Sequence, residues 1–160
     1  MKSNNYKNGF ALVELIVASA IISVTTFALI SAGQKGIVLS ERALHQTQAS
    51  YLLEEGAEAV KSIRDAAWSN ISGLTVGTTY YLSYNTSTNV WSLSATPNTI
   101  DSLFTRTVVL SAVTRDSNDD IASSGTPDSY TKKVTVTVSW PSSEGTVSKT
   151  LLLYITDIFS

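Results

Sequence analysis

The chain has 160 residues, of which 43% are hydrophobic and only 15% are charged, and its formal net charge is −2 at pH 7. That length fits one domain with an appendage. The absence of cysteine excludes disulfides, thiolate metal sites and a cysteine nucleophile. The slightly acidic balance gives no support for nucleic-acid binding, which requires clustered Lys and Arg. Because about 25% charged residues is typical of soluble domains, a soluble core does not account for all of this hydrophobicity.

The excess hydrophobicity lies in residues 10–32, where Glu14 is the only charged side chain. The uncharged remainder of this segment would span about 27 Å as a helix, close to the hydrocarbon thickness of a bilayer. Lys2 and Lys7 precede it without an acidic residue, and positive charge before an apolar segment keeps that end in the cytoplasm. The sequence therefore predicts a transmembrane helix over residues 10–33, with the following residues in the periplasm or outside the cell.

A secretory signal peptide is the alternative interpretation of this segment, because Ala18-Ser19-Ala20 offers a small-residue cleavage site. Glu14 would then interrupt the apolar region of the signal. The apolar run also continues for about 12 residues past that cut, where a mature domain should begin. Both features favour the transmembrane helix.

Glu14 is the most informative residue of the segment, since a carboxylate within a membrane span costs several kcal/mol and usually marks a function. A cut between Gly9 and Phe10 would create an amino group four residues before Glu14. Positions i and i+4 share one helix face, so the two charges could pair within a chain or between chains. The alternative is a Glu14 that is protonated or that extends to the membrane interface.

The run Gly9-Phe10-Ala11-Leu12-Val13-Glu14, followed by a long apolar helix and preceded by a short basic leader, resembles the cleavage and methylation signal of type IV prepilins and pseudopilins. The resemblance covers residue 7 to about residue 32. It implies that a membrane-embedded prepilin peptidase cuts after Gly9, that Phe10 is methylated, and that Glu14 aligns subunits during assembly.

The sequence departs from this family pattern at two positions. Ala11 stands where the family favours Thr or Ser, and Ser31 stands where many members have a helix-kinking proline. A bend at this level would therefore have to come from Gly33 and Gly36, where the helix could also loosen.

Residues 34–65 contain no proline and keep a helical spacing of apolar residues. A continuous helix over residues 10–64 would measure about 82 Å, so its second half needs a surface outside the membrane. Gly56 is a weak point, costing about 1 kcal/mol relative to Ala. We expect the packed stripe to consist of Leu44, Gln48, Tyr51, Leu52, Ala59, Ile63 and Ala67.

Residues 66–160 are rich in Ser, Thr and Asn and alternate with apolar positions, a pattern typical of half-solvated antiparallel strands. The amphipathic helix would cover their apolar faces, giving an α+β fold. Residues 104–113 and 134–140 are also weakly similar to minor pilins and type II secretion pseudopilins. The expected strands are a hairpin of 79–84 and 90–94, then 104–113, 133–140 and, after a turn at 141–145, 147–156.

The sequence offers no catalytic constellation and no cofactor motif. His45 is the only histidine, which excludes a histidine-based metal cluster, and no Ser lies in a Gly-x-Ser-x-Gly elbow. A Gly-rich phosphate loop is also missing. We therefore predict that the chain is not an enzyme and has no catalytic, cofactor or metal residues.

One loop partly resembles a calcium site. Asp116, Asn118 and Asp120 copy the first half of a calcium-binding loop. Ile121 stands where that loop requires glycine, and Pro127 where it requires a bidentate acid. A polar turn between strands is the favoured interpretation.

The sequence therefore predicts a type IV pilin-like structural subunit with the α+β pilin fold, a long N-terminal helix packed on an antiparallel sheet. Its expected parts are a leader (1–9), a transmembrane and assembly helix (10–33), an amphipathic helix (34–65) and a β head (66–160). The expected partners are prepilin peptidase, other pilin or pseudopilin subunits, and the inner membrane before assembly, with no direct contact to nucleic acid. The expected location is the inner membrane with the head in the periplasm, and then a pilus or pseudopilus.

A minor subunit is favoured over a major one. The alternative is an uncleaved, single-pass membrane anchor whose β domain binds a ligand outside the cytoplasm. The choice between pilus, secretion and DNA-uptake machinery is left open by the sequence.

Overall fold

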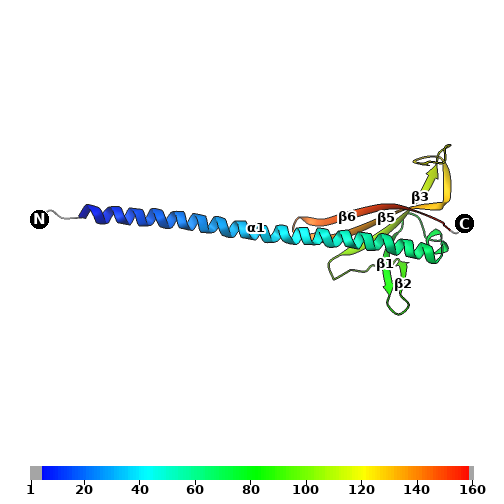
Figure 1. Cartoon of the computed structure of the whole chain (residues 1–160), viewed down its shortest axis with the longest axis horizontal. Coiled ribbons are helices and arrows are strands. Elements are labelled where there is room, and N and C mark those ends of the chain that lie inside the picture. The colour runs from blue at the N-terminus through cyan, green and yellow to red at the C-terminus, as the bar shows by residue number, and fades with distance from the viewer. Residues whose placement is uncertain (1–4, 159–160) are drawn as a thin grey trace. The chain divides into compact units, whose positions relative to one another are not determined.

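The computed structural model describes residues 5–158, with side chains described from residue 10 onward. It divides into two compact units, Met1–His45 and Gln46–Ser160. Figure 1 shows the chain coloured from the N-terminus to the C-terminus, with most of its elements labelled. They are α1 (Asn5–Ala66), α2 (Ser69–Ser72), β1 (Thr79–Asn85), β2 (Val90–Ser94), β3 (Thr105–Arg115), β4 (Ile121–Ala122), β5 (Thr126–Ser142) and β6 (Gly145–Thr156).

The first unit consists of the first part of α1. The helix continues through Gly33 and Gly36 without interruption, so the loosened turn considered at these glycines is not present. A Cβ atom added at either glycine would meet no other atom within 4 Å. Neither glycine is therefore required there by a close contact.

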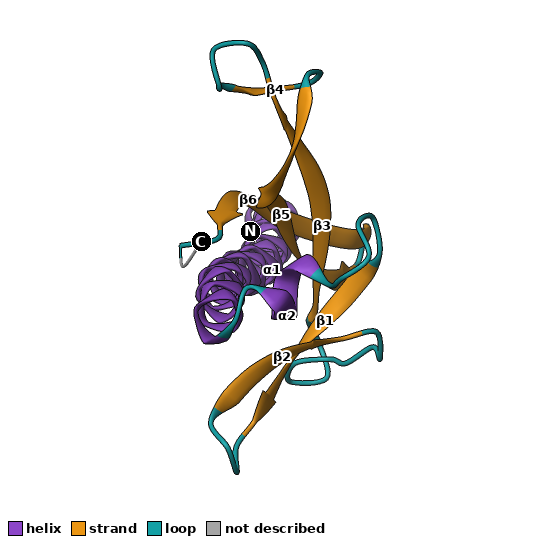
Figure 2. Cartoon of the chain, turned by 90° about the vertical axis from the view of Figure 1, so that its right-hand side faces the viewer, coloured by secondary structure: helices purple, strands orange, loops and turns teal. Residues whose placement is uncertain are grey.

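The second unit is an antiparallel sheet with the strand order β2-β1-β3-β5-β6, and β4 pairs with β3. The end of α1 and the short α2 lie on one face of this strongly twisted sheet (Figure 2). The predicted α+β class is confirmed, and so is the predicted hairpin, in which β1 and β2 pair from Tyr81 with Ser94 to Asn85 with Val90.

The core lies between α1 and the sheet, and the strict alternation of β5 supplies its centre. Val134, Val136 and Val138 are completely buried and Trp140 is nearly so, which confirms the face predicted for this strand. The ring of Trp140 lies 5.8 Å from that of Phe104, centroid to centroid. The other buried members are Ala49, Leu53, Ala59, Val60, Ile63, Ile71, Leu82, Val108, Leu110 and Ile155.

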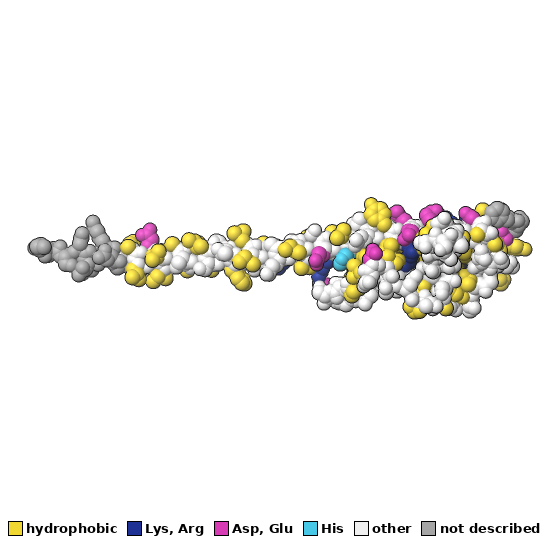
Figure 3. Space-filling view, turned by 90° about the horizontal axis from the view of Figure 1, so that it is seen from below, with side chains coloured by type: hydrophobic (Ala, Val, Ile, Leu, Met, Phe, Trp, Pro, Cys, Tyr) yellow, Lys and Arg dark blue, Asp and Glu magenta, His cyan; other side chains and the backbone are white. Residues whose placement is uncertain are grey.

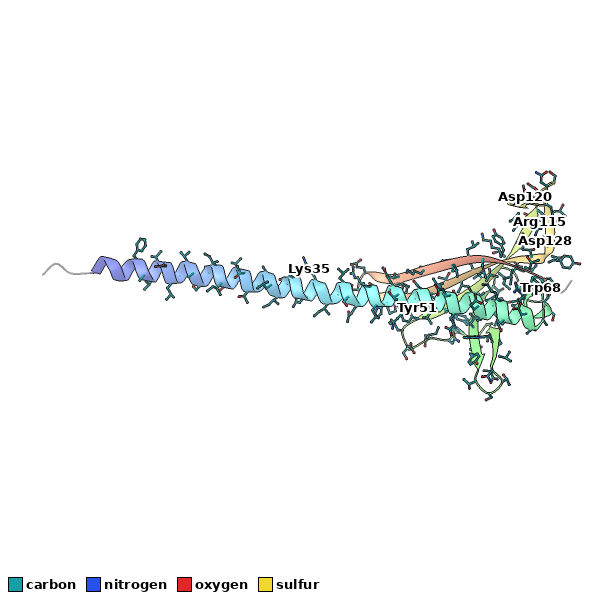
Figure 4. The ribbon with its side chains drawn as sticks, viewed as in Figure 1. Lys35, Tyr51, Trp68, Arg115, Asp120 and Asp128 are labelled. Carbon is teal, nitrogen blue, oxygen red and sulfur yellow. The ribbon has the colours of Figure 1, made fainter. Side chains whose placement is uncertain are left out.

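The helix face predicted to pack on the sheet was wrong in part. Leu44 and Tyr51 are 56% and 67% exposed, and Figure 4 shows Tyr51 on α1. The buried face follows steps of four and three residues through small and branched side chains instead. The predicted Ala59 and Ile63 are confirmed as buried. The buried residues of the helix are Ala49, Leu53, Gly56, Ala57, Ala59, Val60 and Ile63.

Gly56 marks the closest approach of α1 to the sheet. A Cβ atom at this position would lie 2.9 Å from Cγ1 of Val136, 3.1 Å from Cδ of Arg106 and 3.6 Å from Cδ1 of Leu82. These residues belong to β5, β3 and β1, so α1 crosses the middle of the sheet here. Glycine is required because any side chain would separate the two layers.

Arg106 is the charged residue of this contact. Its side chain is only 4% exposed, and Nη1 donates to the carboxylate of Glu55 at 2.6 Å and to the carbonyl oxygen of Leu52 at 3.0 Å. The guanidinium carbon also lies 5.4 Å from the ring centroid of Trp91, within range for a cation–π interaction. A side chain of β3 is therefore bound to α1 and to β2 at once.

β3 and β5 extend beyond the predicted strands. The sequence predicts 133–140, but β5 begins at Thr126 and ends at Ser142, including Pro127 and Pro141. Proline is tolerated near strand ends, where a missing N–H breaks no ladder bond. The extra residues pair with the end of β3, and a register shift between Ala112 and Val113 marks where this extension begins.

This extension forms an arm with the short strand β4 at its end (Figure 2). Arg115 stabilises the arm, because Nε donates to Oδ2 of Asp128 at 2.7 Å and Nη1 donates to the carbonyl oxygen of Asp119 at 2.7 Å. Figure 4 shows Arg115, Asp120 and Asp128 close together there. The hydrogen bond from Arg115 lowers the pKa of Asp128 below its usual range, and one from Thr131 acts in the same direction.

We predict that Gly56→Ala lowers the free energy of unfolding by about 1–2 kcal/mol, because overpacking at the Val136 contact costs up to about 3 kcal/mol and outweighs the roughly 1 kcal/mol gained in helix propensity. Denaturant unfolding of the full chain in detergent, followed by tryptophan fluorescence, measures this change. Gly36→Ala is the matched control, since its Cβ atom meets open space, and it should cause no loss. An equally stable Gly56→Ala variant would contradict the close approach.

We also predict that acid loosens the arm. A carboxyl group with a lowered folded-state pKa stabilises the folded state above its unfolded pKa of about 4, and the contribution disappears as pH falls through the folded value. Amide hydrogen exchange of residues 113–131 between pH 5 and pH 2 should therefore show protection lost below about pH 4. Asp128→Asn should remove this pH-dependent step, and an unchanged step in that variant would exclude Asp128 as its source.

Candidate functional site

The proposed processing junction lies within α1. Gly9 and Phe10 are both helical, and the Phe10 side chain is 79% exposed. The predicted leader covers residues 1–9, of which residues 1–4 lie outside the described residues. Phe10, the residue after the proposed cut, is therefore the first residue of α1 whose side chain is described.

Glu14 lies one helical turn after Phe10, so both residues occupy the same face of α1. The Glu14 side chain is exposed. Among residues 10–158 no hydrogen bond or ion pair involves its carboxylate. Within the described part of the chain, Glu14 is thus a carboxylate on an apolar helix surface without a hydrogen-bond or ion-pair partner.

An uncharged apolar surface surrounds Glu14 and extends along the helix to Lys35, the first charged residue after it. Lys35 is labelled in Figure 4. No residue in the most apolar 18-residue window of this helix is buried, and by length and composition the helix can cross a membrane. Figure 3 shows hydrophobic side chains along this part of α1. The exposed large side chains include Leu12, Val13, Leu15, Ile16, Val17, Ile21, Ile22, Val24, Phe27, Leu29 and Ile30.

Three hydroxyl groups within this apolar segment are satisfied by the helix itself. Ser19 Oγ donates to the carbonyl oxygen of Ile16 at 2.9 Å, and Ser23 Oγ donates to that of Ser19 at 2.7 Å. Thr25 Oγ1 donates to the carbonyl oxygens of Ile21 and Ile22. Because a bilayer offers no water to hydroxyl groups, this self-sufficiency suits a lipid environment.

The other candidates from the sequence lie apart from this segment and show no built site. Asp116 Oδ1 accepts the backbone N–H groups of Asn118 at 2.8 Å and of Asp120 at 3.1 Å. The carboxylate of Asp116 thus closes the turn between β3 and β4. Among the described residues, no group of three or more His, Cys, Asp or Glu side chains could hold a metal ion.

The roles of Arg106, Gly56 and Arg115 in the packing of the head were not predicted from the sequence. The signal for Arg106 was present, because it alternates in β3 with Val108 and Leu110 and so falls on the apolar face. Gly56 interrupts a helical run at a position that shares a face with Leu53 and Val60. All three residues hold the head together, and none lies in the apolar segment.

The comparison with protein families bears on the N-terminal segment. Residues 4–30 match the family described as the prokaryotic N-terminal methylation motif. None of the curated proteins and none of the solved structures compared with the chain matches it.

The motif and the long helix followed by an antiparallel sheet define a pilin-like class of protein. Residues 4–30 carry the methylation motif that marks type IV pilins and pseudopilins, whose members prepilin peptidase processes, and the chain is pilin-like in this motif and in its fold.

Proposed function

We propose that the chain is a minor subunit of a type IV pilus or pseudopilus. In this proposal residues 10–33 hold it in the inner membrane until it assembles with other subunits. The observation that carries the proposal is the unburied, uncharged helical surface beyond Glu14, within the segment that matches the methylation motif. Such a surface is unstable in water and needs either lipid or the helices of other subunits.

Cleavage after Gly9 supplies the partner that Glu14 lacks. The new ammonium group of Phe10 lies four residues before Glu14, and in a bundle of such helices it can reach the carboxylate of a neighbouring subunit. An unpaired charge in this dry environment costs several kcal/mol. Subunits in the wrong axial register would therefore be penalised, and Glu14 would set the register.

The direction of insertion follows from the leader. Lys2 and Lys7 precede the apolar segment, and this keeps the leader in the cytoplasm and places the head in the periplasm. Cleavage then removes the leader, residues 1–9, together with both lysines. The minor role rests on the weak resemblance of residues 104–113 and 134–140 to minor pilins and secretion pseudopilins, which is much less specific than the N-terminal motif.

The alternative from another class is an uncleaved, membrane-anchored binding module. It uses the same apolar helix but gives no role to the Gly9–Phe10 junction. Mass spectrometry of the native N-terminus separates the two functions, because a methylated Phe10 supports the subunit and an intact Met1 supports the anchor.

We predict that replacing Gly9 with a bulky residue, as in Gly9→Leu, leaves an uncut precursor. The peptidase cuts after this glycine, and the larger side chain would block cleavage. Immunoblotting detects a band larger by the leader, and mass spectrometry finds residues 1–9 still attached. Asn8→Gln, one residue earlier in the leader, is the matched control and should be cut normally. A mature Gly9→Leu protein of normal mass would refute the proposed cut.

We further predict that Glu14→Leu and Glu14→Ala are cut normally but are incorporated into filaments at least tenfold less, because the Phe10 ammonium group loses its carboxylate. Quantitative immunoblotting of sheared or purified filaments, compared with the membrane fraction, measures incorporation. Val17→Leu keeps the span apolar and uncharged and should assemble like the unmodified chain. Normal incorporation of both Glu14 variants would rule out the register mechanism.

A further inference from the structure

β6 forms one edge of the sheet, and among the described residues only β5 pairs with it. The strand runs for 12 residues and pairs only with β5. α1 crosses over Val136, Arg106 and Leu82, which belong to β5, β3 and β1. One side of β6 therefore presents unpaired backbone groups along its whole length.

Two features that usually protect an edge strand, a proline and a β-bulge, are missing from β6. It has no proline, and its register with β5 continues without a bulge from Gly145 to Thr156. Its only charged residue, Lys149, turns toward α1, where Nζ donates to Ser50 Oγ at 2.8 Å and to the carbonyl oxygen of Gln46 at 3.2 Å. The opposite edge, β2, has only five residues. Long edges without such protection are templates for pairing with another strand.

The hairpin geometry identifies the unpaired backbone groups. β5 and β6 are joined by two residues, so the closing pair of Ser142 and Gly145 exchanges hydrogen bonds and every second pair after it does the same. Pro141, which has no N–H, falls on the alternate set opposite Thr146. The residues whose N–H and C=O groups point away from β5 are Thr146, Ser148, Thr150, Leu152, Tyr154 and Thr156, and all six side chains are exposed.

We propose that this edge binds β6 of a second copy of the chain in antiparallel orientation. One register satisfies every outward backbone group, because it places Thr150 opposite Leu152, Ser148 opposite Tyr154 and Thr146 opposite Thr156. The same register places Lys149 opposite Leu153, so like charges do not meet. A two-fold axis relates the copies, and each contributes the same surface to the interface.

The two-fold axis is perpendicular to the sheet, so residues 46–66 of α1 in the two heads run in opposite directions. The pairing of the heads requires neither cleavage nor a filament, so it goes beyond the proposed function and does not rest on it.

The absence of cysteine permits a direct test of the register. Thr150→Cys and Leu152→Cys variants of the full chain are purified in detergent, mixed and oxidised. Opposite Cα atoms in a hydrogen-bonded pair lie about 5.5 Å apart, within disulfide range, whereas two copies of the same variant would place their cysteines more than about 7 Å apart. The mixture should form a disulfide dimer in at least tenfold higher yield than either variant alone. No dimer, or equal yields in all three samples, would overturn the proposal.

A second measurement tests the backbone contribution. Leu152→Pro removes an outward N–H and leaves the bonds to β5 intact, whereas Leu152→Thr changes the side chain alone. Sedimentation in density-matched detergent should show dimerisation weakened at least tenfold by Leu152→Pro and retained in Leu152→Thr. Ser148→Pro provides a second test if Leu152→Pro does not fold by circular dichroism. Unchanged dimerisation in the folded proline variant would also overturn the proposal.

Discussion

The close approach of α1 to the sheet at Gly56 is the constraint on which the head depends. The chain has no cysteine, so no disulfide holds the two layers together. Without a side chain at Gly56, Val136 and Leu82 pack directly against the helix. The buried residues on either side of Gly56, such as Leu53 and Val60, then reach the same core. The head therefore needs the last part of α1 to form its core.

Arg106 adds specificity to this apolar contact. Among the described residues it is the one buried charged side chain, and its Nε atom has no hydrogen-bond partner. Burial of a guanidinium group is unfavourable unless it is paired. Glu55, the carbonyl oxygen of Leu52 and the ring of Trp91 provide that pairing only in one placement of the helix. A helix displaced along the sheet would leave Arg106 buried and unpaired.

The same helix thus serves two different environments. Its first part exposes apolar side chains and satisfies its own hydroxyl groups, as expected for lipid or for a bundle of similar helices. Its last part presents Ala49, Gly56 and Ile63 to a sheet. Glu14 belongs to the first environment and Arg106 to the second. In the proposed function, assembly would depend on Glu14, whereas packing of the head depends on Arg106.

The sequence by itself determined the apolar segment, the Gly9, Phe10 and Glu14 spacing and the inward face of β5, because each is a local pattern in consecutive residues. Only the tertiary structure decided which face of α1 is buried. Large side chains such as Tyr51 suggested that their face of the helix is buried. Close packing on the sheet instead buries the face that carries glycine and alanine. The arm and the full length of β5 were also decided there, since a proline such as Pro127 disfavours a strand until its pairing with β3 is known. Such contacts join residues far apart in the chain, so the local spacing of apolar residues does not predict them.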